Sequence, residues 1–172
     1  MYILRWNMMI KLLQTGILWV VLLFGILGGF FFSFSFVTMP GLDLISGVAA
    51  IEAMQGINTA VRNAYFFVPF FLTPVFAFAF AGVAVFTGCR RAAYYLGASA
   101  VLYLAGGFAV TVFYHIPMNE ALAVVDGPVL GVGASEVWRT YSQDWTPLNT
   151  FRMSVCLLAM VLAVLALYET KA

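Results

Sequence analysis

Charge is what this sequence has least of. Only 9% of its 172 residues are Asp, Glu, Lys or Arg, whereas a typical soluble domain carries about 25%. Hydrophobic residues make up 64% of the chain, and the net charge is +1. This composition excludes an ordinary soluble domain and offers no basic surface for a nucleic acid. We therefore expect an integral membrane protein.

Residues that bind metals or carry redox chemistry are also scarce. The chain has one histidine, His115, and two cysteines, Cys89 and Cys156. A single histidine excludes bis-histidine haem ligation and multi-histidine copper or di-iron sites within one chain. Two cysteines cannot hold an iron–sulfur cluster, and no spacing typical of a metal site occurs. We expect neither a metal nor another cofactor.

Long hydrophobic runs, by contrast, are abundant. A helix needs about 20 residues to cross the hydrocarbon core of a bilayer. Four runs reach that length, at about residues 12–37, 65–87, 92–115 and 147–168. The runs are continuous, which favours helices over the alternating strands of a membrane barrel. The sequence predicts an all-α, integral membrane four-helix bundle, with residues 1–172 forming a single transmembrane domain.

The charges between the runs predict the orientation of the bundle. One side holds the two termini and the turn between the second and third runs, with Arg5, Lys11, Arg90, Arg91 and Lys171. The other side holds the two long connections, with Arg62, Arg139, Arg152 and most of the acidic residues. Basic residues favour the cytoplasmic side. We expect both termini in the cytoplasm and the protein in the bacterial inner membrane.

The first long connection, residues 39–63, predicts an amphipathic helix. Pro40 and Gly41 are expected to end the first span, and Asp43 is a candidate N-cap. Apolar residues then recur at helical spacing up to Val61. One interpretation is a lid or tether with a solvated polar face. In the other, Gln55 and Asn58 turn inward and contact a ligand.

The second long connection, residues 116–146, has a turn-rich start at 124–134 and then a short amphipathic helix at about 135–145. Trp138, Tyr141 and Trp145 fall on one face of this helix, at i, i+3 and i+7. Such a stripe is typical of an aromatic belt at the membrane interface. It also suits the wall of a pocket for an aromatic ligand. Thr146 and Pro147 are expected to start the fourth span.

Polar side chains gather where the third and fourth runs meet these connections. If the third helix continues past Pro117, His115 and Asn119 share a face, being four residues apart. Asn149 and Arg152 of the fourth run are expected at the same level of the membrane. A neutral imidazole can act as a general base near pH 7, and an arginine can stabilise an anion formed beside it.

Structural roles are the alternative for these residues. His115 can be a hydrogen-bonded histidine at a helix end. Arg152 can reach toward the membrane surface or form a structural ion pair. Neither the spacing nor the composition decides between these roles and a catalytic one.

Four stretches together resemble one family. They are "GGFFFSFSFVTMPGL", "AIEAMQGIN", "TVFYHIPMNEAL" and "WRTYSQDWTPLNTFR", and the resemblance covers Gly28 to about Val164. In this order they resemble the family of small four-helix membrane proteins that contains the anthrone oxygenases. The most specific elements are the proline–x–asparagine step and the W-x2-Y-x3-W-x3-N-x2-R run.

The resemblance implies a cofactor-independent oxygenase. The best-known members of that family oxidise the activated methylene of a tricyclic anthrone to an anthraquinone with O2. By this analogy His115 is the base, and Arg152 with Asn119 stabilises the anion. The substrate would be bound by Gln55, Asn58, Trp138, Tyr141, Trp145 and Asn149.

A non-enzymatic role stays open beside the oxygenase. The protein would then be an accessory subunit of a larger membrane complex, or would bind a quinone or a lipid passively. The expected partners are membrane lipid and an apolar small molecule, with a larger complex or a homo-oligomer left open. A transporter is disfavoured, because no carboxylate lies in the middle of a run.

Overall fold

The computed structural model describes residues 2–126 and 133–170 and is built from helices, with no strand in that part of the chain. Four helical stretches are long and apolar enough to cross a membrane. The expected all-α, four-span architecture is therefore confirmed. The four stretches are Arg5–Leu42, Ala64–Phe86, Arg90–Ala123 and Ala134–Tyr168.

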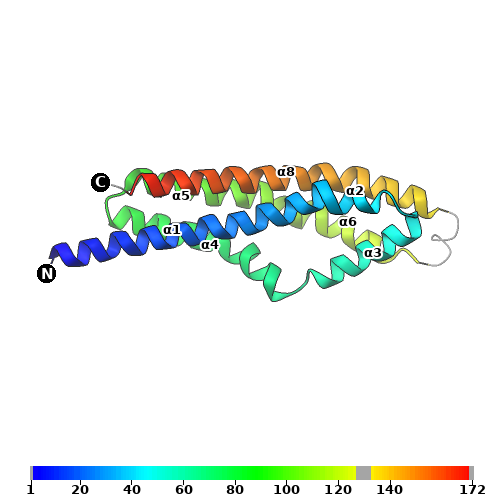
Figure 1. Ribbon diagram of the computed structural model, residues 1–172, viewed down its shortest axis with the longest axis horizontal. Helices are drawn as coiled ribbons and strands as arrows, with labels where there is room; N and C mark the ends of the chain where they lie inside the picture. Colours follow the sequence, from blue (N-terminus) through cyan, green and yellow to red (C-terminus); the bar gives the residue numbers. More distant parts are fainter. Residues whose placement is uncertain (1, 127–132, 171–172) are drawn as a thin grey trace.

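Two of these four stretches are composite. The first joins α1, the π-helix η1 and the short α2, and the third joins α5, η2, η3 and α6 (Figure 1). Two connections are helical as well, through α3 and the beginning of α8. The bounds are α1 Tyr2–Ser33, η1 Phe34–Thr38, α2 Met39–Leu42, α3 Gly47–Ala60, α4 Ala64–Phe86, α5 Arg90–Leu102, η2 Tyr103–Phe108, η3 Thr111–His115, α6 Ile116–Ala123 and α8 Ala134–Tyr168.

The end of the first helical stretch corrects two predictions. Pro40 does not end the helix but lies at the start of α2, where its missing N–H costs little. Asp43 is not an N-cap: it follows α2, and Ser46 caps α3 by accepting a hydrogen bond from the Ala49 N–H. The Asp43 carboxylate instead accepts hydrogen bonds from other parts of the chain, which are described below.

The fourth span begins earlier than expected. The predicted short helix at 135–145 is not separate, because α8 runs unbroken from Ala134 through Pro147 to Tyr168. A proline inside a helix leaves the carbonyl four residues earlier without its partner. Here that residue is Gln143, which is exposed, so the break in the hydrogen-bond ladder lies on the outside. The turn-rich stretch at 124–134 lies partly outside the described residues, as does Lys171.

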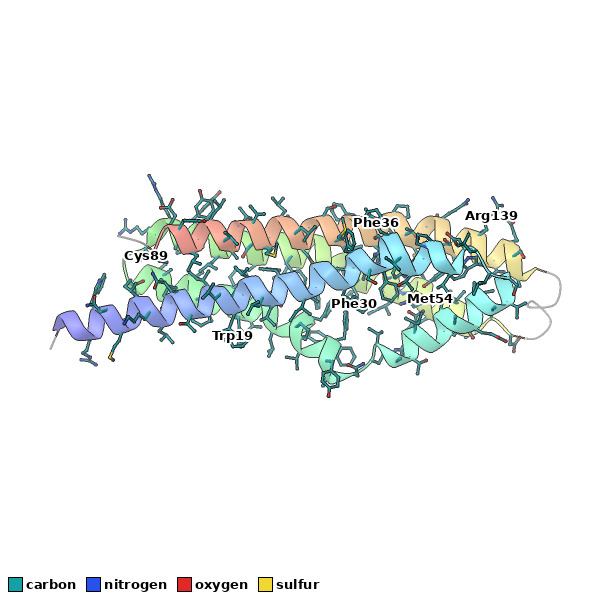
Figure 2. The ribbon with its side chains drawn as sticks, in the orientation of Figure 1. Trp19, Phe30, Phe36, Met54, Cys89 and Arg139 are labelled. Carbon is teal, nitrogen blue, oxygen red and sulfur yellow. The ribbon has the colours of Figure 1, made fainter. Side chains whose placement is uncertain are left out.

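One half of the bundle, which we call the terminal half, carries both chain ends. Both termini and Cys89 lie at this end, and Arg139 lies at the other (Figures 1 and 2). Its core consists of aliphatic, aromatic and alanine side chains of α1, α4, α5 and α8. Alanines let these helices approach closely. The fully buried positions include Leu13, Ile17, Val20, Ala84, Ala92, Leu96, Ala159, Ala163 and Ala166.

The other half, which we call the cavity half, contains Phe30 to Val61, the start of α4, η2 to α6, and α8 up to Arg152. This half has an apolar core of its own, which is made by α2, α3, α6 and α8. The predicted amphipathic α3 buries Ile51 and Met54 in this core. Toward its N-terminal end α4 diverges from the bundle, and α3 descends to meet it (Figure 1).

Candidate functional site

A cavity of about 460 Å³ lies between α3, the diverging start of α4 and the rest of the cavity half. This volume is within the usual range for small-molecule sites, about 300–1,000 Å³. Most of its wall is apolar, and aromatic rings predominate. The lining residues are Phe30, Phe31, Phe34, Ile57, Asn58, Val61, Arg62, Phe66, Phe67, Phe70, Phe71, Phe108, Thr111, Val112, His115, Ile116, Asn119, Glu120, Trp145 and Arg152.

Phenylalanine rings form one wall of this cavity. Phe66 and Phe70 stack on successive turns of α4, with their centroids 5.2 Å apart. Phe108 stacks on Phe70 at 5.3 Å, and Phe30 meets Phe66 at 5.1 Å. Offset or tilted rings at such distances attract one another beyond simple burial. The result is a fixed aromatic surface suited to a flat apolar molecule.

Three π-helical segments border the cavity, and no pattern in the sequence indicates them. The widened turns are marked by hydrogen bonds from the N–H groups of Met39, Ala109 and Ile116 to carbonyls five residues earlier. π-Bulges often occur at functional sites, where they re-aim side chains. Here η3 delivers both Thr111 and His115 to the cavity wall.

Of the two glycines of η2, Gly106 brings this part of the chain against α8, whereas Gly107 lies against a ring of η2 itself. A Cβ added at Gly106 would lie 2.6 Å from a methyl carbon of Val155. A Cβ added at Gly107 would lie 2.8 Å from the Tyr103 ring. Only residues without a side chain fit at these two positions. This close approach sets the distance between η3 and the polar residues of α8.

His115 is buried in the cavity wall, with 1% of its surface exposed. Its Nδ1 lies 3.4 Å from the Val110 carbonyl oxygen, and its ring meets Trp145 edge-on at 4.8 Å. Nε2 has no hydrogen-bond partner among the described residues. A neutral histidine carries one N–H and one lone pair. The tautomer with the proton on Nδ1 satisfies this acceptor and leaves the lone pair on Nε2.

Arg152 is the second buried polar group of the cavity wall, at 4% exposure. One terminal nitrogen donates to Thr111 Oγ1 at 2.8 Å, and the other donates to Asn149 Oδ1 at 2.7 Å. Its guanidinium also lies 4.3 Å from the Phe31 ring centroid and 5.5 Å from that of Trp145. Cations over aromatic faces are attracted by the ring electrons.

No carboxylate compensates this guanidinium within the described residues. The ion pairs there join Arg91 to Glu169 and Arg139 to Glu136, and both lie away from the cavity. Arg152 Nε is buried and makes no hydrogen bond. A buried charge is costly unless it is paired. An anion in the cavity would supply the missing partner, so the structure does not support the alternative of a structural ion pair.

Asn149 lies behind Arg152 and does not line the cavity. Its amide nitrogen donates to the Phe31 carbonyl and to Ser35 Oγ, both at 2.7 Å. These bonds turn the amide oxygen toward Arg152. Asn149 therefore positions the guanidinium, whereas the sequence predicted that it contacts substrate. Ser35 and Thr111 complete this network and were not singled out from the sequence, since a hydroxyl in an apolar run has no distinctive pattern.

Asn119 reaches the cavity from α6, as expected for a residue four positions after His115. Its Oδ1 accepts hydrogen bonds from the Tyr141 hydroxyl at 2.8 Å and from Trp145 Nε1 at 3.1 Å. An indole N–H can only donate, so it fixes the orientation of the amide. The amide nitrogen of Asn119 is then the group left to bond a ligand.

The stripe of Trp138, Tyr141 and Trp145 is buried and does not form an aromatic belt on the surface. Only Trp145 lines the large cavity. Tyr141 supports Asn119, and Trp138 Nε1 donates to the Asp43 carboxylate at 2.8 Å. Ser142 Oγ donates to the same oxygen at 2.8 Å, which fastens the loop after α2 to α8. The predicted pocket wall is therefore formed by one of the three residues.

The two polar residues predicted on α3 have different environments. Gln55 Nε2 donates to the carbonyls of Leu122 and Val125, at 2.9 and 3.0 Å, and so ties α3 to the end of α6. It does not line the cavity. Asn58 does line it, and its Nδ2 is buried without a hydrogen bond of normal geometry. Among the described residues, no group of three or more His, Cys, Asp or Glu side chains is arranged to hold a metal ion.

The fold and the cavity define a class: a four-helix integral membrane protein with an aromatic cavity and a buried His–Arg–Asn cluster. Residues 57–162 match the sequence profile of the anthrone oxygenase family. The match covers more than half of the chain, and the protein belongs to this family. It includes α4, η3, α6 and the part of α8 that bears Arg152. Among curated proteins and solved structures, no match to the chain was found.

Proposed function

We propose that the protein is a membrane-embedded, cofactor-independent oxygenase for a flat, apolar substrate of the anthrone or quinol type. For an anthrone the reaction balances as one methylene group and one O2 giving one carbonyl group and one water. The carbon loses four electrons, and O2 gains them. The observation that carries the proposal is that one aromatic cavity holds both a histidine with a free Nε2 and an uncompensated buried guanidinium.

The first step is removal of a proton from the activated methylene. His115 Nε2 is the base, because Nδ1 faces the Val110 carbonyl and keeps its own proton. General-base catalysis requires contact at about 2.6–3.2 Å. Nε2 has almost no accessible surface. The substrate can therefore contact it only after the imidazole ring rotates away from its packing on Trp145.

The second step is stabilisation of the resulting enolate. Its negative charge lies on the carbonyl oxygen across the ring system from the methylene. Arg152 supplies a fixed positive charge with a free Nε–H, and Asn119 supplies an amide N–H. Donors held in place in a site of low dielectric stabilise such charge without reorganisation. Asn149 and Thr111 hold the guanidinium for this purpose.

The reaction with O2 then needs no further catalyst. The enolate passes one electron to O2, and the resulting carbon radical and superoxide combine to form a C–O bond. The peroxide anion takes its proton from the His115 imidazolium. His115 next removes the remaining C–H proton, the O–O bond breaks, and hydroxide leaves with that proton as water. The histidine ends the cycle in its starting state.

The test is oxygen uptake by the purified protein in lipid vesicles, with anthrone as the probe. The proposal expects quinone formation with one O2 consumed per quinone, and loss of both in His115→Ala. Arg139→Ala is the matched control for Arg152→Ala, because Arg139 is exposed and pairs only with Glu136 on its own helix. Equal rates with and without protein would overturn the proposal.

A passive role is the second candidate, favoured by the aromatic wall of the cavity. The protein would then bind a quinone or a lipid, or would serve as a subunit of a larger membrane complex. Retention of the quinone without anthrone turnover supports this candidate. Stoichiometric co-purification with other membrane proteins supports the subunit.

We also propose that both termini face the cytoplasm of a bacterium whose inner membrane holds the protein. Arg5, Lys11, Arg90 and Arg91 lie at the end of the bundle that carries the termini, which supports this orientation by the positive-inside rule. Modification of a cysteine introduced at Arg139 by an impermeant thiol reagent in whole cells, without modification of one introduced at Arg5, is the expected result. The reverse pattern contradicts it.

A further inference from the structure

The cavity reaches the protein surface at the side of the bundle, between α4 and η3–α6. The lining residues at this mouth are Phe67 and Phe71 on one side and Ile116 on the other. They are 42%, 50% and 41% exposed, whereas His115 and Arg152 at the deep end are buried. The cavity therefore has a direction, from an open apolar mouth to a closed polar end.

The mouth faces the hydrocarbon side of the protein. Beyond it on α4 lie the exposed apolar side chains of Val68 and Leu72, and beyond it on η3 lie Phe113 and Tyr114. Both helices belong to segments apolar enough to span a membrane. Apolar side chains exposed on both edges of an opening would be poorly placed next to water. Lipid is the medium that fits this surface.

The polar part of the rim lies at only one end of the mouth. Arg62 follows α3 just before α4 begins, and Glu120 lies on α6 one turn beyond Ile116. Both are exposed, and neither forms an ion pair with a described residue. Charged residues at the end of a span belong at the level of the headgroups. The rest of the mouth then lies below that level, within the acyl chains.

We propose that the ligand of this cavity is a lipid-dissolved aromatic molecule that enters sideways from the bilayer, through a portal framed by Phe67, Phe71 and Ile116. The inference rests on the proposed function only for the identity of the ligand. The portal itself follows from the cavity and the exposed surfaces. The ligand's rings pass along the Phe66–Phe70–Phe108 wall, and its oxygen reaches Arg152.

The experiment uses Trp145, which lines the cavity, as a reporter. Replacing Trp6 and Trp19 by Phe removes the two exposed tryptophans and leaves Trp138 and Trp145, both buried. The protein is reconstituted in vesicles whose acyl chains carry bromine, which quenches indole fluorescence on contact. We expect lower emission than in unbrominated vesicles and no quenching by aqueous iodide. Adding Trp145→Phe should abolish the lipid effect, because Trp138 does not line the cavity.

A matched pair of variants tests the route. Val112 lines the cavity, whereas Val101 is exposed on α5 and does not line it. Val112→Phe should fill the cavity and restore the emission, and Val101→Phe should leave the quenching unchanged. Quenching by iodide alone would overturn the proposal in favour of a water-filled entrance. Absence of quenching by either agent would show that no portal exists. Neither readout depends on turnover, so failure of the oxygenase proposal would be seen separately.

Discussion

The two halves of the bundle satisfy their buried polar groups in different ways. In the terminal half, buried hydroxyls donate to their own helix: Thr87 donates to the Val83 and Ala84 carbonyls, and Ser99 donates to that of Leu96. One hydrogen bond between helices is also found there, from Gln14 of α1 to Thr170 at the end of α8. In the cavity half, polar groups bond between helices, as Arg152 does with Thr111. Local bonds can be made anywhere along a helix, whereas bonds between helices fix their relative positions.

The contrast extends to the backbone. The terminal half is built from regular α-helix, whereas η1, η2 and η3 all lie in the cavity half. Widened turns and unpartnered buried groups such as Arg152 Nε reduce stability, and such features cluster at functional sites. They occur together around a single cavity, which indicates that this half is shaped for binding and the other for packing.

Removing His115, the proposed base in the cavity half, should have the largest effect on turnover. We expect His115→Ala to lower anthrone turnover by roughly 10²–10⁴-fold, the usual contribution of a general base. Unfolding temperature in detergent should also fall, because truncating a buried ring that packs on Trp145 leaves a cavity, so turnover is compared per folded protein. A variant that keeps wild-type turnover would remove His115 from the mechanism.

Removing the buried guanidinium should have the next largest effect. Arg152→Ala is expected to lower turnover about 10²–10³-fold, as for loss of an oxyanion donor. Arg139→Ala should leave turnover unchanged. Arg152→Lys should recover only part of the rate, because lysine lacks the planar fork that reaches Thr111 and Asn149 together. Full recovery with lysine would show that charge alone matters.

Disturbing the contact between η2 and α8 should lower stability as well as activity. Gly106→Ala places a methyl group against Val155, and such overpacking typically costs about 1–3 kcal/mol. The double variant with Val155→Ala should regain most of this loss. Gly29→Ala, where nothing lies within 4 Å, is the control and should not destabilise the protein. Equal effects of both glycine substitutions in thermal unfolding would contradict the close approach.

Loosening the attachment of α3 to the end of α6 should have the smallest effect. Gln55→Ala removes two hydrogen bonds from α3 to the end of α6, each worth on average about 0.6 kcal/mol in a membrane protein. Faster hydrogen exchange in α3 is expected, with a modest rise in the anthrone KM. Glu52→Ala, an exposed position on the same helix, should change neither. No difference between the two variants would show that α3 is held by its apolar face alone.

The helices could be predicted from the sequence because hydrophobicity dominates in a membrane protein. The four spans, the amphipathic α3 and the grouping of His115, Asn119 and Arg152 all follow from run length and helical spacing. Helix ends were less predictable: Pro40 and Pro147 look like boundaries, yet both lie within helix. A proline is tolerated where it lies at the start of a helical segment, as Pro40 does in α2. It is also tolerated where the carbonyl that it leaves without a partner is exposed, as with Pro147.

The details of the site could not be predicted, because they depend on contacts between distant residues. Spacing placed Asn149 beside Arg152, but only the packing of α1 and η1 shows that its amide is committed to Phe31 and Ser35. Likewise, Gln55 has a polar side chain that could contact a ligand, but in the structure it ties α3 to the end of α6. The π-helical turns do not change the hydrophobic periodicity of the sequence. The direction in which Thr111 and His115 point could therefore be learned only from the structure.

The most direct test of the account is to bind anthrone to the protein without oxygen and record its absorption. The ketone and its enolate absorb at different wavelengths, so proton transfer is seen without turnover. We expect the enolate spectrum with the wild-type protein, and the ketone spectrum with His115→Ala at equal occupancy of the cavity. Enolate in both proteins, or ketone in both, would contradict the assignment of His115 as the base.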